Sequence, residues 1–94
     1  MKLNFEWDEE KAKANLTKHR VSFDEAITVF LDPFSITISD PDHSVEEQRY
    51  IDIGSSDKGH VLVVVYTERG SNIRIISSRK ATLSERKLYQ EGSN

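Results

Sequence analysis

The sequence predicts an α+β domain with two N-terminal helices, a four-stranded antiparallel meander and a C-terminal helix, in that order. Two observations lead to this fold class. Apolar side chains recur with a helical period of about 3.6 residues as far as Phe30, and then alternate with the period of two that is typical of strands. The later strands are separated by short turns, which join antiparallel neighbours. Because no linker or repeat divides the sequence, we expect residues 1–94 to form one domain.

The first helix is expected to begin after Asp8, whose carboxylate can cap it, and to end near Arg20, whose charge suits a helix C-terminus. Ala12, Leu16 and His19 would then share one face of this helix.

The second helix is marked by a capping box formed by Ser22 and Glu25. It should end at Asp32, because the residue before a proline resists helical dihedral angles. The apolar stripe of this helix consists of Phe23, Ala26, Ile27 and Phe30.

Four strands are expected after Pro33. The first covers residues 34–39, where apolar and polar side chains alternate, and the second runs from Arg49 to Gly54. The third, from His60 to Thr67, is apolar on both faces, as in a central strand covered on both sides. The fourth covers residues 72–79, and a capping box of Thr82 and Glu85 then opens a short helix that ends near position 91.

Composition and charge indicate a soluble cytoplasmic protein. The chain has no cysteine, no apolar leader and no apolar run long enough to cross a membrane. Its net charge of −3 hides an asymmetry, because residues 1–57 carry a balance of −7 and residues 58–94 a balance of +4. Such segregation allows a basic face that binds phosphate, although two ordinary solvated surfaces would give the same count.

Ordered motifs along nearly the whole chain resemble the BrnT toxin family. Their order and spacing, rather than any single piece, carry the resemblance. One departure is Ser78, where the family more usually has a small apolar residue. The matching segments are Phe5-Glu6-Trp7-Asp8, Asn15-Leu16-Thr17-Lys18-His19, Val21-Ser22-Phe23-Asp24-Glu25-Ala26, Val29-Phe30-Leu31-Asp32-Pro33, His43 with Glu47 and Arg49, Gly54, Arg74-Ile75-Ile76-Ser77-Ser78-Arg79-Lys80-Ala81-Thr82, Glu85-Arg86 and Tyr89.

The resemblance implies a fold similar to that of RelE-type ribonucleases and a toxin that cleaves RNA and blocks translation. It also implies a neighbouring antitoxin, BrnA, with a ribbon-helix-helix part that binds DNA. Toxin and antitoxin would form a hetero-tetramer that represses its own operon, with operator DNA contacted only through the antitoxin.

Metal-free RNA cleavage needs a base for the ribose 2′-hydroxyl, cations for the pentavalent phosphate and an acid for the leaving oxygen. Arg79 is the foremost candidate cation, because its planar fork can hold a phosphate bidentately. The structural alternative is an ion pair with Glu85 or Asp32. Arg74 would lie on the opposite face of a regular strand, unless a bulge intervenes.

Other candidates surround the second strand and the helices. Arg49 and Glu47 would share one face, as a salt bridge or a working pair, and His43 is the candidate acid or base, unless it is merely an exposed loop residue. Candidates for binding RNA, with solvation or packing as their alternatives, are Lys18, Arg74, Lys80 and Tyr89.

No cofactor and no metal are expected. The segment Asp40-Pro41-Asp42-His43 offers carboxylates and an imidazole, but it lacks the glycine and final glutamate of a calcium-binding loop.

A second functional hypothesis keeps the fold but not the chemistry. The chain would be an inert module that binds the antitoxin and acts as a co-repressor, with its basic half as the interface.

Overall fold

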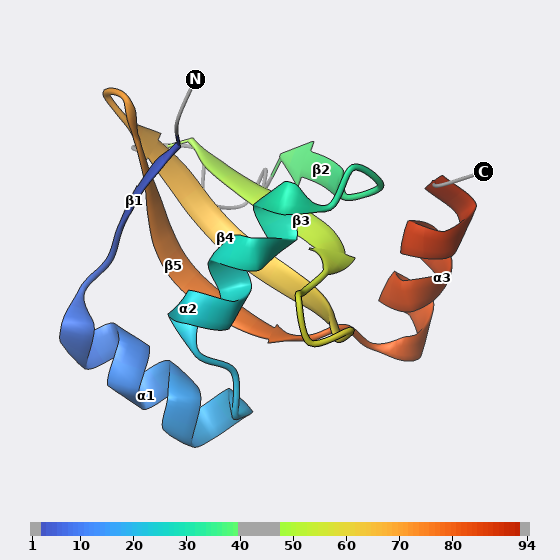
Figure 1. Cartoon of the computed structure of the whole chain (residues 1–94), viewed down its shortest axis with the longest axis horizontal. Coiled ribbons are helices and arrows are strands. Elements are labelled where there is room, and N and C mark those ends of the chain that lie inside the picture. The colour runs from blue at the N-terminus through green and yellow to red at the C-terminus, as the bar shows by residue number, and fades with distance from the viewer. Residues whose placement is uncertain (1–2, 40–47, 93–94) are drawn as a thin grey trace.

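A computed structural model describes residues 3–39 and 48–92 (Figure 1). A five-stranded sheet with strand order β1-β5-β4-β3-β2 forms its centre. The strands are β1 (Asn4–Glu6), β2 (Ile36–Ser39), β3 (Arg49–Ser55), β4 (Val61–Arg69) and β5 (Asn72–Lys80). The helices are α1 (Glu9–His19), α2 (Phe23–Ala26), the 3-10 helix η1 (Ile27–Leu31) and α3 (Leu83–Gly92).

The predicted α+β class is confirmed, but the all-antiparallel, four-stranded sheet is wrong. The additional strand is β1, which pairs with β5 in parallel and makes the sheet mixed. Its register places Phe5 beside Ile73 and Glu6 beside Arg74. Three residues are too few to show an alternation in sequence, and this pairing joins the two ends of the chain.

Local capping signals are confirmed at the helix N-termini. The Asp8 carboxylate accepts hydrogen bonds from the backbone amides of Glu10 and Lys11 in the first turn of α1. Thr82 and Glu85 form a reciprocal capping box at α3. The box at α2 is only half formed. Ser22 Oγ accepts from the Glu25 amide at 3.0 Å, but the Glu25 carboxylate binds Ser56 and His60 instead. The predicted second helix is also divided, since α2 continues as the tighter η1.

One face of the sheet carries the main core. Side chains from the middle of β4 and β5 pack there against the segment from Val21 to Val29, and α1 and α2 lie over this face (Figure 1). Asn15 fastens α1 to the sheet, because its amide bonds both backbone groups of Ser78. The buried members of the core are Val21, Phe23, Ala26, Val29, Leu62, Val64, Tyr66 and Ile75. We call this side of the sheet the covered face.

The opposite face is only partly covered. Helix α3 packs against β3 near the end of the sheet where β5 finishes, and Ile53 and Val63 are buried on this face. Farther along, Ile51 and Val65 are half-buried. Within the described residues, no helix has the length and apolar character needed to cross a lipid bilayer.

Candidate functional site

A bulge in β5 brings Arg74 and Arg79 to the same face of the sheet. Val65 of β4 pairs with Ser77, whereas the next residue, Tyr66, pairs with Ile75, so Ile76 is the extra residue. Arg79 therefore pairs with Val63 and Arg74 with Thr67. These two β4 residues are four apart and lie on one face, which is the face opposite the core. From the sequence, Arg74 and Arg79 were expected on opposite faces unless a bulge intervened. The structure contains this bulge.

Arg49 joins the same face from the other side of β4. It pairs with Thr67, so Arg49 and Arg74 flank this threonine on neighbouring strands. Arg79 lies about 13 Å farther along the sheet by strand geometry. We call the sheet surface with Arg49, Ile51, Val65, Arg74, Ser77 and Arg79 the arginine face.

Arg79 forms a bidentate ion pair with Glu85 of α3. Its Nη1 donates to Glu85 Oε1 at 2.7 Å and to the Lys80 carbonyl at 3.3 Å, and its Nη2 donates to Glu85 Oε2 at 2.8 Å. The hydrogen bond from Arg79 lowers the pKa of Glu85 to about 2. A guanidinium has five N–H groups. The N–H group of Nε and one N–H group of Nη2 have no partner in the described part of the chain. Arg79 can therefore still donate two neighbouring hydrogen bonds to a ligand.

Arg74 is also paired with a carboxylate, whereas Arg49 has no such partner within residues 3–39 and 48–92. Arg74 Nη1 donates to Glu6 Oε2 at 2.8 Å. Hydrogen bonds from Asn72 and Arg74 lower the pKa of Glu6. Arg49 is half-buried and forms no ion pair with any residue in the described ranges. Among the three arginines of this face, Arg49 is the one without a carboxylate partner in the described residues.

Tyr89 holds α3 in place through its hydroxyl. The hydroxyl donates to Asp32 Oδ2 at 2.7 Å, and the same oxygen accepts the Ser55 amide at 2.8 Å. This hydrogen bond to Asp32 raises the pKa of Tyr89 to about 12. The hydroxyl thus serves as an anchor between α3 and the end of η1, which leaves only the ring of Tyr89 for contact with a base.

Two predicted cations lie away from the arginine face. Lys18 is exposed in the last turn of α1, on the side of the covered face. Lys80 pairs with Leu62 and therefore projects from the covered side at the end of β5. His43 and Glu47 lie outside the described residues, together with the rest of the segment 40–47, and their roles remain predictions.

A cavity that sequence reasoning missed lies at the end of β5, where Lys80 is located. Its residues include His60 and Arg86, and His60 Nδ1 lies 2.9 Å from Glu25 Oε2. The sequence showed His60 only as the start of an apolar strand and Glu25 only as a helix cap. Because these residues come from distant parts of the chain, no spacing rule would have grouped them.

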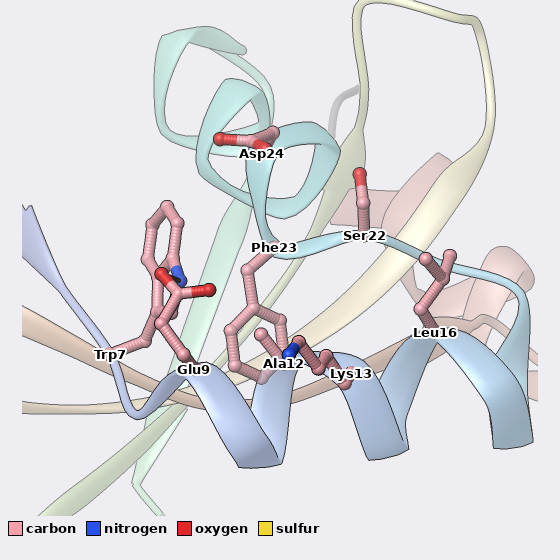
Figure 2. Close-up of a pocket in the computed structure, with 8 residues that line it drawn as sticks. All are labelled: Trp7, Glu9, Ala12, Lys13, Leu16, Ser22, Phe23 and Asp24. Atoms are coloured by element: carbon pink, nitrogen blue, oxygen red, sulfur yellow. Dashed lines mark hydrogen bonds between the residues drawn. The ribbon is translucent and has the colours of Figure 1, made fainter.

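Another cavity lies between α1 and α2 and has a volume of about 340 Å³. Figure 2 shows Trp7 and Phe23 among its lining residues, and the two rings meet edge to face with centroids 5.8 Å apart. Glu9, Asp24 and Lys13 also line it. Two carboxylates against one lysine make this cavity unsuitable for a polyanion.

The fold and the arginine face define a small α+β protein with a sheet surface suited to a polyanionic ligand. Residues 7–85 match the family model of the "Ribonuclease toxin, BrnT, of type II toxin-antitoxin system". The chain therefore belongs to the BrnT family of ribonuclease toxins.

A solved structure supports this assignment. The chain is similar to the crystal structure of the Brucella abortus ribonuclease toxin BrnT, with 25% sequence identity and a TM-score of 0.65. The similarity covers 86% of this chain and 99% of the Brucella protein. Among curated proteins, none matches the chain in sequence.

Proposed function

We propose that this protein is a metal-independent endoribonuclease of the cytoplasm, which cleaves RNA and thereby inhibits translation. The family supports ribonuclease activity in general. The observation that carries the specific proposal is the β5 bulge, because it aligns Arg49 and Arg79 on one open sheet face. Two guanidinium groups on one surface can grip a phosphodiester backbone and compensate the charge that develops during cleavage.

In this mechanism the ribose 2′-hydroxyl attacks the neighbouring phosphorus, the bond from phosphorus to the 5′-oxygen breaks, and a 2′,3′-cyclic phosphate forms. Arg79 binds the scissile phosphate through its remaining donor fork, while Glu85 fixes the orientation of the guanidinium. Arg49, about 13 Å along the sheet, holds another phosphate of the backbone and so orients the strand for in-line attack. His43 takes the proton from the 2′-hydroxyl and returns it to the leaving oxygen, and Glu47 follows it four residues later in sequence.

The partner in this proposal is a BrnA-like ribbon-helix-helix antitoxin in a hetero-tetramer. A toxin of a type II system implies an antitoxin. An acidic antitoxin segment laid over the arginine face would block RNA and neutralise Arg49. Operator DNA would be contacted through the antitoxin alone.

The test is incubation of purified protein with RNA in a metal chelator. We expect the parent to cleave the RNA, and Arg79→Ala and Arg79→Lys to be about 100-fold slower or worse, because a lysine lacks the planar fork. Lys13→Ala, an exposed charge on α1, is the matched control and should cleave like the parent. Parent protein that leaves RNA intact would refute the ribonuclease proposal, and equal rates for Arg79→Ala and the control would remove Arg79 from the site.

One observation favours a second candidate function. Arg74 and Arg79 are both paired with carboxylates, as expected of an inert module that binds only the antitoxin. Expression without the antitoxin separates the two functions. Growth arrest with RNA breakdown supports the enzyme, and tolerated high expression supports the module.

A further inference from the structure

A cavity of about 400 Å³ opens where β4 begins, β5 ends and α3 starts. Its volume lies in the range of ordinary small-ligand sites. Three of its six lining residues are basic or imidazole side chains, and none is acidic. We call it the His60 cavity, and its lining residues are Gly59, His60, Val61, Lys80, Ala81 and Arg86.

The imidazole of His60 is held in place by a buried carboxylate. Its Nδ1 lies 2.9 Å from Glu25 Oε2, and the exposed fractions of the two side chains are 43% and 6%. Ser56 Oγ donates to the same oxygen at 2.6 Å. Burial acts to raise the pKa of Glu25, but the hydrogen bonds from Ser56 and His60 outweigh it, so the pKa is lowered and Glu25 stays a carboxylate. Such a carboxylate fixes Nδ1 as the protonated nitrogen and leaves Nε2 for a ligand.

Lys80 and Arg86 add positive charge that no carboxylate in the described ranges compensates. This distinguishes the His60 cavity from the arginine face, where Arg74 and Arg79 are paired with Glu6 and Glu85. The flexible ammonium group of Lys80 and the planar guanidinium of Arg86 thus line one hollow beside a fixed imidazole. The two cations together offer more donors than one carboxylate can accept, and they match the several oxygens of a phosphate.

We propose that the His60 cavity binds a backbone phosphate of the RNA substrate, as a second subsite beside the one at Arg79. This inference rests on the proposed ribonuclease function. The two subsites are neighbours, because Arg79 and Lys80 are consecutive and Arg79 Nη1 donates to the Lys80 carbonyl at 3.3 Å. An RNA strand that leaves Arg79 around the end of β5 reaches Lys80 and Arg86 next.

The experiment measures the affinity of the full chain for a short 2′-O-methyl RNA, which cannot be cleaved, by fluorescence anisotropy at several salt concentrations. We expect Lys80→Ala and Arg86→Ala each to weaken binding about tenfold and to lower the salt slope by about 1. Lys87→Ala, on the same helix as Arg86 and outside the cavity lining, is the matched control. All three side chains are exposed, so the variants should fold, and circular dichroism checks this.

Affinities equal to that of Lys87→Ala would overturn the inference, and so would parent protein that does not bind the RNA. Variants that bind RNA normally but lose the antitoxin would overturn it too, and would assign the cavity to an acidic protein segment. Cleavage of unmodified RNA by the parent, measured in parallel, reports on the proposed function separately. A cleaving parent with unaffected cavity variants refutes only the second subsite.

Discussion

The covered face and the arginine face belong to the same five-stranded sheet, but they satisfy their polar groups differently. On the covered face, Asn15 is 7% exposed and makes three hydrogen bonds, all to backbone groups. On the arginine face, charged side chains form ion pairs near solvent, and Arg49 lacks an ion pair within the described ranges. Substitutions on the covered face should therefore change stability, and those on the arginine face should change activity.

The largest change in stability is expected from Asn15→Ala. Strand β1 covers the outer edge of β5 at residues 72–74. Farther along the same edge, the backbone groups of Ser78 form their hydrogen bonds with the side-chain amide of Asn15 instead. Removing it leaves buried backbone groups unsatisfied and should cost about 3 kcal/mol. Urea unfolding followed by Trp7 fluorescence measures this, with the exposed Lys13→Ala on the same helix as control. A loss below about 1 kcal/mol would show that the edge of β5 does not depend on Asn15.

A pH-dependent effect is expected at Asp52 on the covered face. Burial raises the pKa of this carboxyl, which is 3% exposed and accepts hydrogen bonds from Thr37 and Tyr66. A raised pKa in the folded state gives stability that is fully present below the ordinary value of 3.8 and is lost as the pH rises through the folded value.

Asp52→Asn removes this titration and keeps an acceptor oxygen. The free energy of unfolding of the parent should therefore fall relative to that of Asp52→Asn as the pH rises from 4 to 7. Parallel pH profiles for the two proteins would mean that Asp52 does not titrate differently on folding.

The smallest stability effect is expected at the arginine face, from Glu85→Gln. The substitution keeps the acceptor for the Thr82 amide but removes the charge paired with Arg79. Because the Arg79 side chain is 42% exposed, solvent screens the pair, and the loss at pH 7 should be about 0.5 kcal/mol.

The contribution of this ion pair is present above the ordinary pKa of 4.5 and is lost as the pH falls through about 2. Chemical denaturation at pH 7 and pH 2 should therefore show a smaller difference at the lower pH. A loss as large as that of Asn15→Ala would erase the distinction between the two faces.

The local elements of the fold were predictable from sequence because their signals are local. Asp8, Ser22 and Thr82 cap helices within three residues of themselves. Alternation, a continuous apolar run and the turns between them located the four longer strands. Strand β1 was missed because its partner is 68 residues away and three residues show no period. The pairing of β1 with β5 places Glu6 beside Arg74, which explains their ion pair.

The candidate site was only partly predictable for the same reason. Arg49, Arg74 and Arg79 were identified as cations, but their common face depends on the bulge at Ile76, which has no turn residue to announce it. The contact between Glu25 and His60 joins a helix to the start of β4, and their separation of 35 residues hides it from any spacing rule.

The most direct test of catalysis on the arginine face is the initial rate of RNA cleavage by Arg49→Ala, measured in chelator beside the parent. Lys11→Ala, an exposed charge on α1, serves as the control. We predict a loss of about 100-fold or more for Arg49→Ala, an unchanged urea midpoint, and a control that cleaves like the parent. A rate for Arg49→Ala equal to that of the control would contradict the account.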